Sequence, residues 1–239
     1  MIRPHTNWCG GLLAFFAVFT YIVKKIRGGN CVGKAVIWDL DGTLLDSYGV
    51  IVESLQLTMQ EHGIMVAYDE VWQHTIRYSV SSFLEQMSAK YKLPVELLKQ
   101  HYSQISGDKY HDIVCMKNAL EVLQQLQESG VEHYVFTHRG KTTIPVLYHL
   151  GLAGFFREVI TSQSGFARKP APDAINYLVA KYGLQKCDTY YVGDRSLDMQ
   201  CARNAGISGI LFLDEKTPGV PTGEETYLVR DLMEILQIL

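Results

Sequence analysis

The stretch AVIWDLDGT, residues 35–43, decides the fold of this chain. Its first four residues are apolar and predict a short buried strand, and Asp39 and Asp41 then lie on the same face of an extended segment. Gly42 and Thr43 turn the backbone away. Because two close carboxylates repel each other, the arrangement indicates a site that holds a cation or keeps one carboxyl group protonated. A strand end that carries two solvated aspartates is the alternative.

From about Met116 onward the sequence alternates between helix and strand patterns. Such alternation predicts an α/β fold, a Rossmann-like parallel sheet with helices on both faces. A short helix over residues 231–239 is expected to close the chain, after a loop at 217–224. The expected strands cover residues 131–137, 158–161, 189–192 and 209–213, and the expected helices cover residues 120–127, 142–150, 171–182 and 197–205.

Between the first strand and this alternating region, residues 47–111 have an almost wholly helical pattern. Breaks are expected at Gly63, around residues 78–81 and at Pro94. Apolar residues recur at helical spacing in each segment, which predicts a small helical bundle.

The N-terminal run at residues 10–23 contains no charge and is followed at once by the cations of residues 24–27. It is somewhat shorter than the roughly 20 residues that span a bilayer. If it inserts, those cations keep the rest of the chain cytoplasmic. A hypothesis of equal rank is that residues 1–31 are not translated, because RGG at 27–29 is what a purine-rich ribosome-binding sequence encodes and Val32 lies at the distance of a GUG start.

The composition fits one substantial α/β core plus a smaller unit, with 239 residues of which 47% are hydrophobic and 20% charged. The net charge of −3 lacks the basic excess that binding a nucleic acid polymer requires. The cysteines show neither a C-x-x-C pair nor metal-type spacing, which argues against a disulfide framework and a zinc site and fits a reducing cytoplasm. They are Cys9, Cys31, Cys115, Cys187 and Cys201.

Chemistry in parallel α/β sheets gathers at the carboxyl ends of the strands, where loops converge and helix N-termini point. In this sequence, carboxylates, a hydroxyl group and an amine all follow expected strands, which a chance collection would not do. The residues expected at this edge are Asp39, Asp41, Thr137, Lys169, Asp194 and Asp198.

At these residues the sequence resembles the haloacid dehalogenase-like (HAD) hydrolase superfamily, in its phosphatase branch with a helical cap inserted after the first motif. The resemblance covers about residues 32–239. It implies a catalytic core over 32–46 and 113–239 and a helical cap over 47–112, and it leaves residues 1–31 as a separate N-terminal apolar extension. Its four motifs are Asp39-Leu40-Asp41-Gly42-Thr43, Thr137 at the end of an apolar strand, Lys169-Pro170, and Gly193-Asp194 with Asp198 following.

The resemblance also implies roles for these residues. Asp39 is the expected nucleophile, since a carboxylate can attack phosphorus and form an aspartyl-phosphate. Asp41 is the expected general acid and base, which protonates the leaving alkoxide and then takes a proton from water. Lys169 balances charge on the phosphoryl group, and the Thr137 hydroxyl donates to its oxygens.

A cation is needed where carboxylates meet a phosphate dianion, and an oxygen-only ligand set implies Mg²⁺. The expected ligands are Asp39, Asp194 and the backbone carbonyl of Asp41. Asp198 is expected to act through water or by orienting Lys169.

Residues that contact the rest of the substrate are less clearly marked in the sequence. The residue after the motif threonine is often Asn or small in this superfamily, whereas this chain has His138 and Arg139. These two either touch substrate or line a solvated loop. Thr43 in the first loop, and Arg77 and Ser81 from the cap, are further candidates. The alternative for Ser81 is that it caps a helix.

The leading functional hypothesis is a Mg²⁺-dependent phosphatase for a small phosphorylated metabolite, with phosphoglycolate as the best single guess by resemblance. A β-phosphoglucomutase-like phosphosugar mutase has the same motifs. A non-catalytic HAD-fold binding protein would have lost a catalytic position, and none is lost. A dehalogenase is disfavoured because it needs neither Asp41 nor a metal. Membrane association is expected only if residues 10–23 insert, and no oligomeric state is predicted.

Overall fold

The computed structural model describes residues 33–215 and 221–239. Residues 33–239 form one compact unit. The apolar run at 10–23 and the possible start at Val32 lie outside the described residues. Among the residues that are described, no helix is long and apolar enough to cross a membrane.

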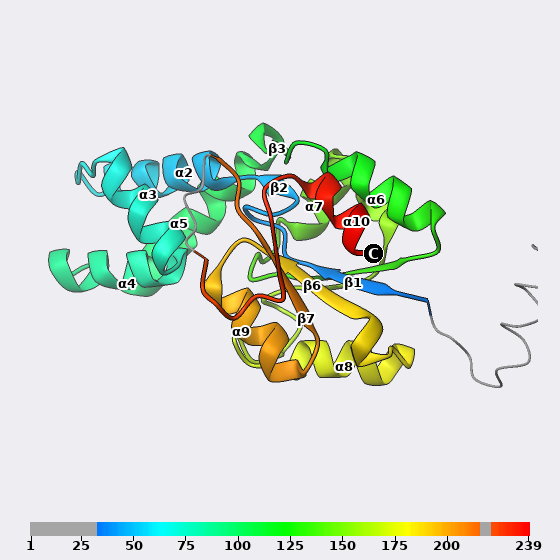
Figure 1. Cartoon of the computed structure of the whole chain (residues 1–239). Helices are drawn as coiled ribbons and strands as arrows, with labels where there is room; N and C mark the ends of the chain where they lie inside the picture. The colour runs from blue at the N-terminus through cyan, green and yellow to red at the C-terminus, as the bar shows by residue number, and fades with distance from the viewer. Residues whose placement is uncertain (1–32, 216–220) are drawn as a thin grey trace, which may run out of the picture. The chain divides into compact units, whose positions relative to one another are not determined.

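A six-stranded parallel sheet lies at the centre of this unit, in the order β5-β4-β1-β6-β7-β8 (Figure 1). β1 pairs with β4 on one side and with β6 on the other. All four residues of β1 are buried, as its apolar sequence predicts for a central parallel strand. The strands are β1 (Ala35–Trp38), β4 (Glu132–Phe136), β5 (Phe156–Ile160), β6 (Thr189–Gly193), β7 (Ser208–Phe212) and β8 (Tyr227–Val229).

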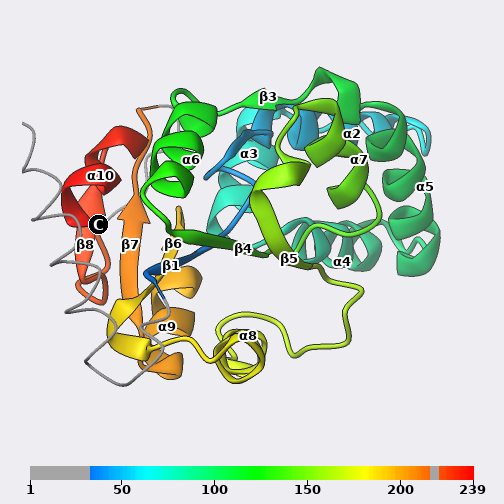
Figure 2. The ribbon, with the colours of Figure 1, turned by 90° about the vertical axis from the view of Figure 1, so that its right-hand side faces the viewer.

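Helices cover both faces of this sheet, so the predicted Rossmann-like α/β fold is confirmed. Figures 1 and 2 show α6, α7 and α10 over one face and α8 and α9 over the other. A 3-10 turn at Leu232–Glu234 precedes α10. The helices are α6 (Ala119–Glu128), α7 (Thr143–His149), α8 (Asp173–Tyr182), α9 (Ser196–Ala205) and α10 (Ile235–Ile238).

Four further helices come between β1 and β4 and form the bundle that we call the cap. They are α2 (Tyr48–Gln60), α3 (Tyr68–Arg77), α4 (Val80–Tyr91) and α5 (Val95–Asp108). The cap has a hydrophobic cluster of its own, separate from that of the sheet. The buried members of this cluster are Tyr48, Ile51, Val52, Leu55, Met59, Val71, Phe83, Leu84, Met87 and Leu98.

A small antiparallel pair joins the cap to the sheet. β2 (Leu45–Asp46) pairs with β3 (Val114–Cys115), so the chain enters and leaves the cap side by side. This pair and the edge strand β8 are not among the elements expected from the sequence.

Candidate active site

The loop after β1 carries two carboxylates and makes a tight turn. The main-chain N–H groups of residues 43–45 all donate to the carbonyl oxygen of Leu40, at 2.9 to 3.0 Å. Gly42 has a φ of +80°, a left-handed conformation that residues with a Cβ rarely adopt. Asp39 points into the protein and is 1% exposed, whereas the side chain of Asp41 is 20% exposed.

Glycine at two motif positions lets acidic side chains approach the backbone. A Cβ at Gly42 would lie 2.4 Å from Asp194 Oδ2 and 2.4 Å from the ring of Tyr48. A Cβ at Gly193 would lie 2.5 Å from the Cβ of Asp198. All three separations are shorter than non-bonded atoms allow, so any larger residue would push these side chains away.

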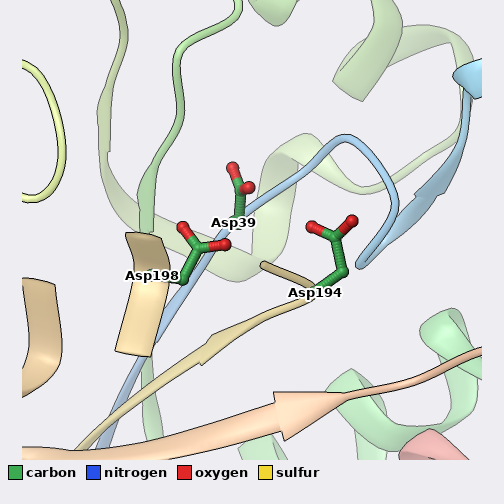
Figure 3. Close-up of side chains that lie close together, drawn as sticks. All are labelled: Asp39, Asp194 and Asp198. Atoms are coloured by element: carbon green, nitrogen blue, oxygen red, sulfur yellow. The ribbon is translucent and has the colours of Figure 1, made fainter. Parts of the chain in front are cut away.

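Asp39, Asp194 and Asp198 form a buried acidic cluster, and their side chains point toward one another (Figure 3). Each offers an oxygen within 4.8 Å of the others, and each residue is at most 5% exposed. Within the described residues, Asp39 Oδ2 has no hydrogen-bond partner. Burial raises the pKa of Asp39 and raises the pKa of Asp194 to about 7. Clustered carboxylate oxygens with this unbalanced charge fit a hard divalent cation.

Lys169 links two members of the acidic cluster. Its Nζ lies 2.9 Å from Asp39 Oδ1 and 2.8 Å from Asp198 Oδ1, and its side chain is fully buried. Burial alone would lower the pKa of Lys169, but the charges of Asp198 and Asp39 outweigh burial and raise it. The lysine is therefore charged in the folded protein. Asp198 is further fixed by the Tyr191 hydroxyl, which donates to Oδ1 at 3.3 Å.

The side chain of Asp41 has different partners and stands apart from the acidic cluster. Arg139 Nε donates to its Oδ1 at 3.0 Å, and the Ser47 hydroxyl donates to the same atom at 2.7 Å. Burial would raise the pKa of Asp41, but the charge and hydrogen bonds of Arg139 outweigh it and hold the pKa below its usual value. Asp41 is therefore a carboxylate at neutral pH.

The cap reaches into the site through Tyr48, the first residue of α2. Its hydroxyl group donates to Asp194 Oδ2 at 2.7 Å. The Thr43 hydroxyl lies 3.5 Å from Asp194 Oδ1, so Thr43 is buried against the acidic cluster. The sequence pattern gives no sign of the Tyr48 contact, because Tyr48 is indistinguishable there from the apolar residues that pack the cap.

Thr137 ends β4 and lies at the same edge of the sheet. It is 1% exposed, and its hydroxyl oxygen accepts from the Arg139 N–H at 3.1 Å. The ring of His138 accepts from the Lys169 main-chain N–H at 3.0 Å through Nε2. The loops that follow β4 and β5 are therefore joined beside the acidic cluster.

A cavity of about 290 Å³ lies between the cap and the core and opens onto this site. Asp41, Ser81, His138 and Arg139 line it. Arg77 does not, because its exposed guanidinium group lies 5.5 Å from the centre of the Tyr78 ring instead. The hydroxyl group that caps α4 is that of Ser79, which accepts from the Ser82 N–H.

Comparison with known proteins defines the class of the molecule. The family model described as haloacid dehalogenase-like hydrolase matches residues 36–212. The chain therefore belongs to the haloacid dehalogenase-like hydrolase family, as its motifs predict.

Within this family, the chain is similar to proteins named phosphoglycolate phosphatase. The phosphoglycolate phosphatase of Aliivibrio fischeri is 30% identical over 216 residues, which cover 82% of this chain and 95% of the relative. That of Pseudomonas savastanoi pv. phaseolicola is 26% identical over 217 residues, covering 85% and 78%. The crystal structure of a predicted phosphoglycolate phosphatase from Haemophilus somnus shares the fold, with a TM-score of 0.72 at 21% identity over 88% of this chain and 99% of that one. The prediction of a phosphatase enzyme in this family is confirmed.

Proposed function

We propose that the protein hydrolyses a small phosphomonoester with the help of Mg²⁺, through an aspartyl-phosphate on Asp39. One observation carries this proposal: Asp39 Oδ2 is buried without a hydrogen-bond partner, beside a charged lysine and two further aspartates. Such an oxygen is stable only if a cation or an electrophile approaches it.

Each step of this proposal has a residue in position to perform it. A carboxylate oxygen of Asp39 forms a bond to phosphorus while the bond from phosphorus to the alcohol oxygen breaks. Lys169 stays charged beside Asp39 and offsets the negative charge of the transferring group. Asp41 takes up the proton that a substrate monoanion brings, gives it to the leaving alcohol and later takes one from the attacking water. Its carboxylate form, which Arg139 holds in the free protein, is the form that accepts that proton.

The acidic cluster supports the Mg²⁺ part of the proposal. Asp39, Asp194 and the backbone carbonyl of Asp41 would hold the ion, with Asp198 orienting Lys169 or acting through water. When bound, the ion supplies positive charge that neutralises the carboxylates and the phosphate oxygens together.

The relatives and the cavity support a small substrate, and phosphoglycolate is the first candidate because the relatives named above carry that name. A cavity of about 290 Å³ suits a molecule of this size. We assign residues 47–112 to the substrate-covering cap and residues 32–46 and 113–239 to the catalytic core. A reducing cytoplasm is the proposed location, which the free cysteines at 115, 187 and 201 support.

The decisive experiment measures phosphate release from 2-phosphoglycolate and p-nitrophenyl phosphate, with Mg²⁺ and after EDTA treatment. Asp39→Asn should lower kcat by about a thousandfold or more, because the nucleophile is lost. Asp108→Asn, at an exposed carboxylate on α5, is the matched control and should retain activity. Wild-type rates in Asp39→Asn would refute the nucleophile, and undiminished rates after EDTA would refute the Mg²⁺ requirement.

A further inference from the structure

His138 makes two contacts that fix where its proton lies. Its Nε2 accepts from the Lys169 main-chain N–H at 3.0 Å. Burial, followed by the charges of Lys169 and Arg168, lowers the pKa of His138 to about 3. The ring is therefore neutral at working pH, and a neutral ring that accepts through Nε2 carries its proton on Nδ1.

This tautomer leaves two donors facing each other. Arg168 Nη2 lies 3.2 Å from His138 Nδ1, and a guanidinium group has donors only. The N–H groups of Arg168 and His138 cannot accept hydrogen bonds from each other, so both need an acceptor. An oxygen anion that accepts from both would be that acceptor.

Arg195 adds a further guanidinium group to the wall of the same cavity, beside Arg168 and Arg139. Its Nε is buried and has no hydrogen-bond partner among the described residues. After burial, the charge of Arg195 is the largest cause that lowers the pKa of Arg168. The positive charges of the two side chains therefore oppose each other, although the acidic cluster offsets part of the charge of Arg195 and Glu85 offsets part of that of Arg168.

The carboxylate in the lining of this cavity already has hydrogen-bond partners. Asp41 is the only carboxylate among the described residues that line it, and Arg139 and Ser47 occupy its oxygen. In the described part of the chain, no carboxylate lies within 4.0 Å of a side-chain nitrogen of Arg168 or Arg195, whereas Lys109, Lys181 and Arg203 have such partners. The cavity wall keeps an excess of positive charge and of hydrogen-bond donors.

The position of these donors limits the size of the ligand. His138, Arg168 and Arg195 are the chain neighbours of Thr137, Lys169 and Asp194, which surround the proposed phosphoryl site. All three donors line the same cavity as Asp41, the proposed general acid, so a group that they bind belongs to the same small substrate.

We propose that the substrate carries a second anionic group, a carboxylate or a second phosphate, which accepts hydrogen bonds from Arg168, from Nδ1–H of His138 and from Arg195. The ligand class is then a short phosphorylated acid or bisphosphate, in place of a neutral sugar or alcohol phosphate. This inference rests on the proposed phosphatase function and specifies its substrate.

The test compares three substrates on the same protein: 2-phosphoglycolate, 2-hydroxyethyl phosphate, in which a neutral hydroxymethyl group replaces the carboxylate, and ethylene glycol bisphosphate. For the wild type, kcat/KM should be at least about tenfold higher for one of the two substrates with a second anionic group than for 2-hydroxyethyl phosphate. A preference for 2-phosphoglycolate identifies the second anionic group as a carboxylate, and a preference for ethylene glycol bisphosphate identifies it as a phosphate.

Variants locate the selectivity. Arg168→Gln should bring the ratio of kcat/KM values toward 1, and Arg168→Lys should recover part of it. Arg230→Gln, at an exposed arginine outside the cavity lining, should keep the wild-type ratio. The two kcat/KM values in each ratio come from one protein preparation. Partial misfolding lowers both values by the same factor and leaves their ratio unchanged.

Three results would overturn the inference. Equal efficiency on all three substrates by the wild type would overturn it while leaving the phosphatase function intact, as would a wild-type ratio in Arg168→Gln. Hydrolysis of no phosphomonoester at all would overturn the proposed function, and this inference with it.

Discussion

At the scale of single residues, Gly42 shows most sharply how the site depends on close approach. Replacing it with alanine should lower the free energy of unfolding by roughly 1–3 kcal/mol, because a Cβ meets Asp194 and Tyr48 at a left-handed φ. Activity should fall much further, since the displaced carboxylate belongs to the acidic cluster. Thermal unfolding and phosphate release measure the two effects.

The matched control is Gly63→Ala in the cap. Gly63 has a φ of +73° but no atom within 4 Å of an added Cβ. This variant should lose only the conformational cost of about 1–2 kcal/mol and should keep its activity. Equal loss of activity in both variants would show that backbone strain, and not crowding of Asp194, explains the effect.

The sequence could predict the strand-end residues because topology alone brings them together. Asp39, Thr137 and Asp194 each follow a strand of one parallel sheet, so their shared edge follows from the alternating pattern. The partners of Asp41 and Asp194 could not be predicted, since Ser47 and Tyr48 reach the site through the turn of the backbone after Gly42. A contact between the cap and the core has no signature in periodicity.

At the scale of elements, His133 couples the central strands β1 and β4 to pH. Trp38 Nε1 donates to His133 Nδ1 at 3.1 Å, and burial lowers the pKa of this histidine from 6.5 to about 4. Below about pH 6.5 the unfolded chain takes up a proton that the folded protein refuses. The free energy of unfolding should therefore fall as the pH drops from 6.5 toward 4, by up to about 3 kcal/mol from this residue.

Denaturant unfolding at pH 7 and pH 5 measures this loss of unfolding free energy in His133→Gln and in the wild type. The variant should lose less stability than the wild type between the two pH values. His111→Gln, at an exposed histidine, should follow the wild type. Parallel pH dependence in wild type and His133→Gln would contradict the assignment.

Elements with several turns or strong alternation were predictable within a few residues, as the helices α6 and α9 show. Their apolar faces repeat often enough to define a period. β2, β3 and β8 have only two or three residues, too few to show a period of two, and their pairing partners alone make them strands. Local pattern therefore predicts the frame of the sheet but not its shortest additions.

At the scale of the whole molecule, the acidic cluster should tie folding to Mg²⁺. An ion that binds only the folded protein adds about 2.7 kcal/mol to the free energy of unfolding at a hundred times its Kd. The gain should be larger at pH 8 than at pH 6, because the ion competes with the proton that Asp194 holds up to a pKa of about 7. Calorimetric unfolding with Mg²⁺ and with EDTA measures it.

Asp194→Asn should abolish most of this stabilisation, whereas Asp108→Asn should retain it. An equal Mg²⁺ effect in Asp194→Asn would place the ion elsewhere on the protein.

The antiparallel pairing of β2 with β3 has a consequence for how this enzyme can change. Leu45 pairs with Cys115, so the two ends of the helical insertion lie next to each other on one rung of a ladder. The helical bundle is therefore inserted between two adjacent, paired strands. Exchanging the helices beyond Tyr48 for a bundle of another length or sequence leaves the register of the parallel strands untouched. Ser47 and Tyr48 would have to stay, because their hydroxyl groups contact Asp41 and Asp194.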